Sequence, residues 1–183
     1  MKFTKTAIDD VIVCEPIVHG DERGYFSETY RKDKLESFLG YALDFCQDNE
    51  SKSSKGVIRG LHYQLPPFDQ TKFVRVIQGR VLDVAVDIRQ GSPTFGQHVS
   101  VELSAENKKQ LLVPKGFAHG FLVLEDDTIF SYKVDNVYSK DHDRSIAFDD
   151  PDIGINWNLP KESLIASDKD LTAPRLKETT ELF

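Results

Sequence analysis

Apolar and polar residues alternate with a period of two along much of the chain. In residues 81–89 one face carries Leu82, Val84, Val86 and Ile88, while Asp83 and Asp87 fall on the other. Residues 98–103 and 128–135 alternate in the same way. This period is typical of half-buried β-strands, and clusters of glycine, proline and aspartate separate the runs as turn signals. We therefore predict a series of short, closely spaced strands.

Helical patterns are few. One convincing helix has Asp33 as its N-cap, an apolar stripe that begins at Leu35, and Gly40 at its end. A second, shorter helix is predicted around residues 160–164. Many short strands with few helices predict a mainly β sandwich or barrel. A length of 183 residues, without an internal repeat or a low-complexity segment, predicts one domain over residues 1–183.

Composition and charge exclude several classes of protein. The 30 acidic residues outnumber the 23 basic ones, for a net charge of −7, which argues against a nucleic-acid binder. No uncharged apolar run is long enough to span a membrane, and Asp9 and Asp10 stand where a signal peptide needs its apolar stretch. Cys14 and Cys46 have no zinc-ligand spacing and are expected to be reduced thiols. We expect a cytoplasmic protein with no membrane or nucleic-acid partner.

Two segments are dense in residues that can do chemistry. Residues 56–64 contain Gly56 and, six positions later, His62, and residues 114–121 contain Pro114, Gly116 and His119. This spacing resembles the paired motifs of the cupin superfamily. The resemblance implies a double-stranded β-helix, or jelly roll, with a few short helices.

The cupin motifs are altered at the positions that would ligate a metal ion. A metal-binding cupin presents two histidines, a glutamate and a later histidine, whereas this chain presents His62, Gln64, Lys72 and His119. A lysine ammonium has no lone pair to offer and repels a cation. We therefore expect no metal and no other cofactor.

A narrower resemblance covers most of the chain, from about residue 10 to about residue 175. The stretches GDERGYFSETY, FCQDNESKSSKGVIRGLHYQ, KFVRVIQGRVLDVAVDIR, VPKGFAHGFLVL and SDKD are similar, in order and spacing, to those of dTDP-4-dehydrorhamnose 3,5-epimerases. The resemblance implies cofactor-free inversion of C3 and C5 in a dTDP-linked 4-keto-6-deoxy sugar, as a step of dTDP-L-rhamnose biosynthesis.

The same resemblance implies catalytic roles for four residues. His62 matches the base, which suits a group whose pKa lies near working pH. Asp170 matches the carboxylate that orients the base, with Asp168 as the second choice. Tyr132 matches the acid on the opposite face of the sugar. Lys72 matches the cation beside the C4 oxygen, where it would stabilise an enolate.

Further positions match residues that hold the nucleotide and sugar. Arg23 and Arg59 match those that contact the diphosphate, a task that suits a forked, permanently charged donor. The other matching positions are Glu28, Gln47, Asn49, His119, Asp143 and Lys169. The family pattern also implies a homodimer with shared active sites, in which Arg23 and Glu28 reach the ligand of the neighbouring subunit.

Two local expectations follow from the strand pattern. On an ideal strand Arg59 and His62 point to opposite faces. Both can face one cavity only if the strand is interrupted, and Gly60 is the natural place for a bulge. In addition, a buried lysine needs an anionic partner, and Asp83 is the simplest partner for Lys72.

Other functions with the same residues stay open. A single-centre epimerase or a ketoisomerase on a related 4-keto-6-deoxy nucleotide sugar would have nearly the same motifs. A non-catalytic cupin that only binds a sugar would have no reason to keep a base, an acid and an enolate-stabilising cation together. A metal-dependent cupin oxygenase is disfavoured because the ligands are missing.

Overall fold

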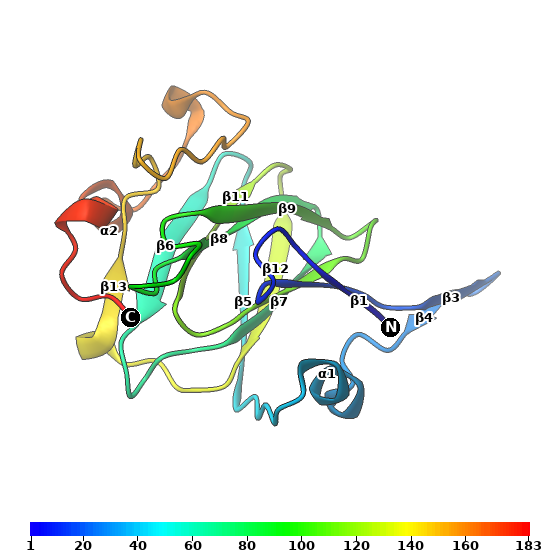
Figure 1. Cartoon of the computed structure of the whole chain (residues 1–183). Coiled ribbons are helices and arrows are strands. Elements are labelled where there is room, and N and C mark those ends of the chain that lie inside the picture. The colour runs from blue at the N-terminus through cyan, green and yellow to red at the C-terminus, as the bar shows by residue number, and fades with distance from the viewer.

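Two antiparallel β-sheets face each other in the computed structural model, which describes residues 1–183 (Figure 1). The larger sheet runs, from edge to edge, through β1 (Lys2–Lys5), β2 (Ile12–Glu15), β10 (Gln110–Val113), β7 (Lys72–Gln78), β12 (Thr128–Val134) and β5 (Gln47–Ser53). The smaller sheet runs through β13 (Asp143–Ser145), β6 (Ile58–Gln64), β11 (Phe117–Val123), β8 (Arg80–Asp87) and β9 (His98–Ser104). The expected mainly β jelly roll is confirmed.

The space between the sheets holds the central core. Val74 and Phe130 from the larger sheet pack in one buried cluster with Val81, Phe117 and Phe121 from the smaller one. Phe121 and Phe130 stack across this space with their ring centroids 4.0 Å apart. Burying an apolar side chain of this size stabilises the fold by roughly 1.5–3 kcal/mol. The core therefore fixes the spacing between the two sheets and, with it, the width of any cavity between them.

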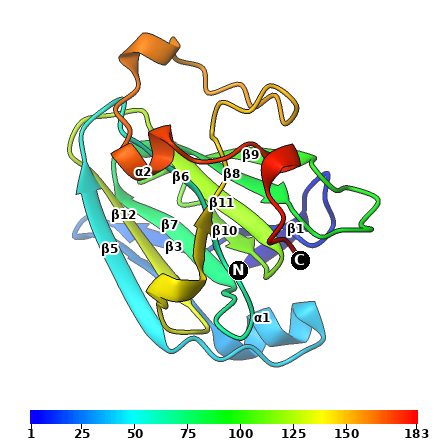
Figure 2. The ribbon, with the colours of Figure 1, turned by 90° about the vertical axis from the view of Figure 1, so that its left-hand side faces the viewer.

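Strand β8 is buried on both faces, so the prediction of a half-buried strand at residues 81–89 was wrong. Asp83 and Asp87 are 0% exposed. The outer face of β8 is covered because the chain after β13 returns across the smaller sheet (Figure 2) and packs Phe148 and Trp157 against it. The alternation at residues 128–134 does mark a strand with one buried face, as predicted.

Burial of Asp87 serves the structure of a loop. Its carboxylate accepts hydrogen bonds from Arg89, Ser92 and Thr94. Burial alone would raise the pKa of Asp87, but these hydrogen bonds outweigh it and hold the pKa well below its usual value. The carboxylate thus stays ionised and ties the loop after β8 to the sheet.

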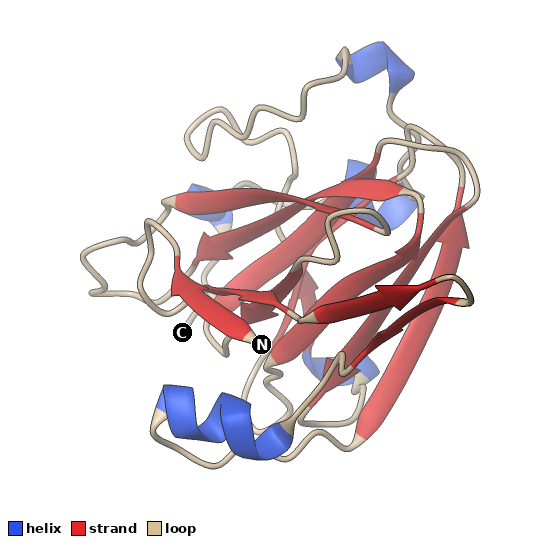
Figure 3. Cartoon of the chain, turned by 90° about the vertical axis from the view of Figure 1, so that its right-hand side faces the viewer, coloured by secondary structure: helices blue, strands red, loops and turns tan.

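The predicted helix forms as α1 (Lys32–Leu39), with one difference at its start. Arg31 is the N-cap and Asp33 lies in the first turn, while Gly40 ends the helix in the left-handed conformation, as expected. Helix α1 covers one end of the outer face of the larger sheet (Figure 3), where Leu35 packs against Phe73.

The remaining helices are single turns. The helix expected around residues 160–164 is the 3₁₀ turn η2 (Lys161–Ser163). Two further 3₁₀ turns are η1 (Lys140–His142) and η3 (Leu176–Glu178), and a four-residue helix, α2, spans Asp168–Leu171. None of these helices has the length and apolar character that crossing a membrane requires.

A hairpin of β3 (Val18–Asp21) and β4 (Gly24–Ser27) extends away from the body of the protein (Figure 1). Both strands are almost entirely exposed, and they include the apolar side chains of Val18, Tyr25 and Phe26. Tyr25 contacts Lys108, but the apolar side chains of the hairpin otherwise stay exposed, which is typical of a segment that contacts a partner.

Candidate active site

A cavity of about 490 Å³ lies between the two sheets. Four strands and one helix each supply a polar side chain to its wall: His62 from β6, Lys72 from β7, His119 from β11, Tyr132 from β12 and Asp170 from α2. The structure therefore brings together the residues matched to the base, its orienting carboxylate, the acid and the enolate-stabilising cation.

The expected irregularity at Gly60 is present and explains how Arg59 and His62 both line this cavity. The pairing of β6 with β11 joins His62 to His119 and Arg59 to Phe121, a shift of one residue. Gly60 has a φ of +124°, and a Cβ there would lie 2.5 Å from the Cα of Gly120. Only glycine permits this backbone with so close a neighbour.

His62 is held by a buried carboxylate. Its Nε2 lies 2.5 Å from Oδ1 of Asp170, whose side chain is 3% exposed. Ser167, the N-cap of α2, donates a second hydrogen bond to Asp170. Burial raises the pKa of Asp170, but the hydrogen bond and the charge of His62 outweigh burial, so the pKa lies below its ordinary value. Asp168, the second choice from the sequence, lies exposed on the outside of α2.

Lys72 has no ion partner. Its Nζ donates to the backbone carbonyl of His62 at 3.3 Å, and no carboxylate lies within 4.0 Å of it. Burial lowers the pKa of Lys72 from 10.5 to about 8, against the weaker opposing influence of Asp143 and Asp83. The expectation that Asp83 forms its ion pair was wrong.

Asp83 instead binds His119. Nε2 of His119 lies 3.0 Å from both carboxylate oxygens of Asp83, and the two side chains are 7% and 0% exposed. The histidine ring also lies against Phe130 and Phe121. These contacts fix the ring of His119 in the cavity wall.

Tyr132 lies in the sheet opposite His62. Its ring packs against Phe130, and the structure gives its hydroxyl no hydrogen-bond partner within the chain. Burial raises the pKa of Tyr132, and the charge of Arg59 offsets only part of this. The phenol therefore carries its proton at neutral pH and is free to give it to a ligand.

A second cavity, of about 320 Å³, continues from the first. Gln47 and Asn49 line it from β5, joined by a hydrogen bond of 2.7 Å. On another side Asp143 accepts hydrogen bonds from Lys169 and from Tyr138. The two cavities share three residues, His62, Lys72 and Tyr132.

Tyr138 is a lining residue that the sequence reading missed. The residue is 59% exposed, although it lies beside polar groups in a cavity. The only sequence signal for Tyr138 was that it is an aromatic residue in a polar loop. Such residues are also common in surface loops that have no function.

Two of the expected ligand contacts lie elsewhere in the chain. Arg23 is at the tip of the β3–β4 hairpin, where it pairs with Asp21. Glu28 pairs with Arg31 and Lys34 ahead of α1. Neither lines either cavity. In contrast, Arg59 lines the first cavity and donates to Ser53 at 3.1 Å.

The chain contains no cluster of three or more histidine, cysteine or acidic side chains that could hold a metal ion. His62 and His119 each pair with one aspartate rather than with each other. The cavity instead combines two imidazoles, one ammonium and one phenol, which are groups that move protons and stabilise negative charge.

Comparison with known proteins identifies the family. A family model described as dTDP-4-dehydrorhamnose 3,5-epimerase matches residues 5–178. The chain belongs to this family. The dTDP-4-dehydrorhamnose 3,5-epimerase of Shigella flexneri is 53% identical over 175 residues, which cover 96% of each protein. The resemblance seen in the sequence is thus confirmed.

Solved structures extend the comparison. The dTDP-6-deoxy-D-glucose-3,5-epimerase of Legionella pneumophila, in complex with dTDP-4-keto-L-rhamnose, is 48% identical with a TM-score of 0.92, over 96% of this chain and 93% of that one. A 3′-monoepimerase of Streptomyces bikiniensis, in complex with dTDP-quinovose, is 33% identical with a TM-score of 0.88, over 94% and 87%. As a member of the dTDP-4-dehydrorhamnose 3,5-epimerase family, the chain is an enzyme of the isomerase class.

Proposed function

We propose that this chain, acting as one domain over residues 1–183, inverts C3 and C5 of dTDP-4-dehydro-6-deoxy-D-glucose and gives dTDP-4-dehydro-L-rhamnose for dTDP-L-rhamnose biosynthesis. Both centres adjoin the C4 ketone, so removal of either proton gives an enolate. Inversion needs a base on one face of the sugar, an acid on the other, and a group that stabilises the enolate oxygen. The observation that carries the proposal is that His62 and Tyr132 reach one cavity from opposite sheets, with Lys72 beside them.

His62 is the base. The 2.5 Å contact of its Nε2 with Asp170 leaves the other ring nitrogen for the substrate. Asp170 stays ionised because its pKa is lowered, so it stabilises the imidazolium that forms when His62 takes a proton. A positioned base of this kind contributes roughly 10²- to 10⁴-fold to the rate.

Tyr132 is the acid. The raised pKa of its phenol keeps the proton in place until a carbanion forms nearby. Because β12 and β6 belong to facing sheets, a sugar between them is deprotonated on one face by His62 and protonated on the other by Tyr132. This is the stereochemical requirement for inversion.

Lys72 stabilises the enolate. Its ammonium has no carboxylate within 4.0 Å, so its charge is available to a substrate oxygen rather than neutralised within the chain. His119, fixed by Asp83, lines the same cavity and binds the sugar. In a cavity with little water such fixed charges act strongly because little solvent screens them.

The substrate extends over both cavities. Arg59 binds the diphosphate in the first cavity, and Gln47, Asn49, Asp143 and Lys169 hold the nucleotide and sugar from the second. Arg23 and Glu28 serve the site of a second subunit in a homodimer. Their distance from the cavity of their own chain and the exposed apolar hairpin support this arrangement.

The test is proton exchange in D₂O, followed by NMR with the 4-keto sugar nucleotide as substrate. We expect deuterium at both C3 and C5, and no exchange at either with His62→Ala. Asp168→Asn, on the exposed side of the same helix as Asp170, is the matched control and should exchange normally. No exchange with the wild-type protein would support a non-catalytic sugar-binding cupin instead.

A single-centre epimerase is the second candidate, because a 3′-monoepimerase shares the fold at a TM-score of 0.88. Deuterium at one carbon only would favour it. The higher identity to 3,5-epimerases, 53% against 33%, supports inversion of both centres. We place the enzyme in the cytoplasm, because its two cysteines, Cys14 and Cys46, are both free thiols, as is usual in that compartment.

A further inference from the structure

The carboxylate of Asp170 makes two hydrogen bonds, one through each oxygen. Oδ1 lies 2.5 Å from Nε2 of His62, and Oδ2 accepts a hydrogen bond of 2.8 Å from the hydroxyl of Ser167. The Asp170 side chain is only 3% exposed, so loss of a donor would leave a buried acceptor unpaired. Ser167 is therefore the second of two groups that hold this carboxylate.

The hydroxyl of Ser167 is itself oriented by the backbone. Its Oγ accepts a hydrogen bond of 3.2 Å from the backbone N–H of Asp170, as the N-cap of α2. A hydroxyl has one proton to donate and lone pairs that accept. Because the N–H occupies a lone pair, the proton is left for the carboxylate. One serine thus binds both the backbone and the side chain of the same aspartate, which restricts the rotation of that side chain.

The backbone ahead of Ser167 is anchored to the strand that carries His62. Ile165 forms a parallel β-bridge with the residue that precedes β6, and its carbonyl accepts a hydrogen bond of 3.0 Å from the N–H of Ile58, the first residue of β6. The base and the start of α2 are therefore attached to the same strand. What remains to be set is the direction of the Asp170 side chain.

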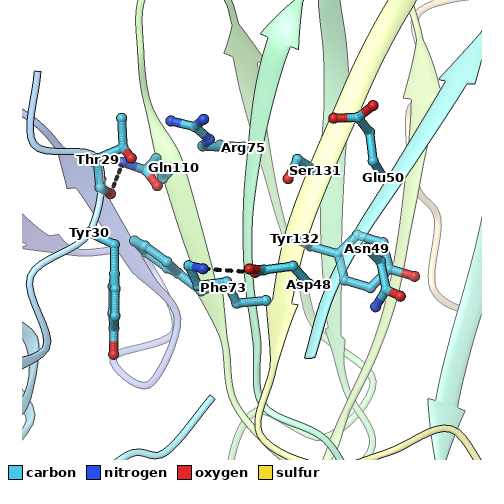
Figure 4. A pocket seen from close by; sticks show the side chains of 11 residues that line it. Thr29, Tyr30, Asp48, Asn49, Glu50, Phe73, Arg75, Gln110, Ser131 and Tyr132 are labelled. Atoms are coloured by element: carbon cyan, nitrogen blue, oxygen red, sulfur yellow. Dashed lines mark hydrogen bonds and ion pairs between the residues drawn. The ribbon is translucent and has the colours of Figure 1, made fainter. Parts of the chain in front are cut away.

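The acid is held by other parts of the chain. Tyr132 lies in the larger sheet beside Asn49 of the adjacent strand (Figure 4), and its ring packs against Phe130. A change at Ser167 therefore acts on the base and leaves the acid in place. Loss of the serine hydroxyl should slow proton removal and inversion by the same factor, unlike loss of the acid.

We propose that Ser167 is a positioning residue for the epimerisation. Its hydroxyl holds Asp170 in the orientation in which Oδ1 faces His62, so that the imidazole presents its other ring nitrogen to the sugar. This role rests on the proposed function, in which His62 is the base, and it adds a third residue to the pair of His62 and Asp170. Ser167 takes no proton from the substrate and acts only through Asp170. Such preorganisation saves the base from reorienting during the reaction.

Three substitutions separate positioning from helix capping. Ser167→Ala removes both hydrogen bonds of the hydroxyl. Ser167→Asp keeps a good N-cap, but an ionised carboxylate only accepts hydrogen bonds and repels Asp170. Ser167→Thr keeps the hydroxyl. We expect wash-out of substrate protons into D₂O to slow about tenfold in Ser167→Ala, at least as much in Ser167→Asp, and to stay near the wild-type rate in Ser167→Thr.

Thr172→Val is the matched control. Thr172 is the C-cap of α2, and its hydroxyl donates to the carbonyl of Asp168 at 2.8 Å. The substitution therefore removes a hydroxyl from the same short helix while the hydrogen bonds of Asp170 stay in place, and the rates should be unchanged. If Thr172→Val slows the reaction as much as Ser167→Ala does, any weakening of the helix is sufficient, and the positioning role is rejected.

Proton NMR of the enzyme without substrate measures the same contact directly. The proton between Nε2 of His62 and Asp170 should resonate far downfield, because this hydrogen bond is short and charge-assisted. Its absence from the spectrum of His62→Ala assigns it. We expect the resonance to move upfield or broaden in Ser167→Ala, to recover in Ser167→Thr, and to be unchanged in Thr172→Val.

The outcomes distinguish the role of Ser167 from the proposed function. An unchanged resonance in Ser167→Ala, wild-type rates in Ser167→Asp, or wash-out and inversion that fall by different factors would each reject the positioning role and leave the enzyme as proposed. A wild-type protein that exchanges no substrate proton would reject the proposed function. In that case the resonance would still show whether Ser167 orients Asp170 toward His62.

Discussion

The buried ammonium of Lys72 predicts that activity and stability respond to alkaline pH in opposite directions. Below its pKa of about 8, Lys72 is an ammonium and stabilises the enolate. Above that pH it becomes a neutral amine and loses this ability. We therefore expect kcat/KM to fall as pH rises through about 8, since kcat/KM reports the ionisation of the free enzyme.

The stability effect has the opposite sign. In the unfolded chain Lys72 keeps its proton up to the ordinary value of 10.5, whereas the folded protein releases it near 8. Between these values the unfolded state binds more protons, so the free energy of unfolding rises with pH. At about 1.4 kcal/mol per pKa unit, burying the ammonium costs the folded protein up to about 3 kcal/mol below pH 8. The cost disappears as pH approaches 10.5.

The assay compares wild type with the Lys72→Met variant, which carries a neutral side chain of similar length. Urea unfolding from pH 7 to pH 10.5 should show that the variant is more stable than wild type at the lower pH, with the difference narrowing as pH rises. Other titrating groups are the same in both proteins, so the difference isolates Lys72. Activity of the variant should be very low throughout. A kcat/KM profile that stays level to pH 10, or a stability difference that does not change with pH, would refute the reasoning.

Three further changes test other parts of the site. Tyr132→Phe should keep the wash-out of substrate protons into D₂O, because the base remains. Inversion should slow by roughly 10²-fold or more, because the proton donor on the opposite face is lost. If NMR shows that wash-out and inversion fall equally, Tyr132 only shapes the cavity. Asp170→Asn should slow both wash-out and inversion by a similar factor, because the imidazolium of His62 loses its carboxylate partner; wash-out at the wild-type rate would contradict this role. Activity should survive exhaustive chelation, with no transition metal near stoichiometry by elemental analysis; loss on chelation that a metal restores would overturn metal independence.

Periodicity identified the strands but not their surroundings. The pattern at residues 81–89 has polar residues on one face, which is normally the solvent side of a sheet. Here that face points into the barrel, and Asp83 and Asp87 are satisfied there by His119 and by the loop after β8. A period-two pattern gives the separation of faces but not which face is covered, because the covering segment comes from a remote part of the chain.

The position of Asp170 shows a different kind of gap. The sequence around it looks like a charged tail, yet Ser167 caps a four-residue helix that turns Asp170 inward. Helices this short have no amphipathic repeat to recognise. The resemblance to a family identified Asp170 because the family pattern includes residues that meet only in the folded protein. Helix propensity describes only neighbouring residues and could not identify it.

Gly60 shows that a conflict between two expectations can itself be informative. Arg59 and His62 cannot share a face on a regular strand, and the resemblance placed both at one ligand. The resolution required a break at a glycine, and the register of β6 on β11 shifts by one residue at that point. The break also brings Gly60 against Gly120, so two glycines allow β6 and β11 to approach closely between His62 and Arg59. This irregularity interrupts the regular hydrogen bonding between the two strands. It therefore turns both His62, which transfers the proton, and Arg59, which binds the diphosphate, toward one cavity.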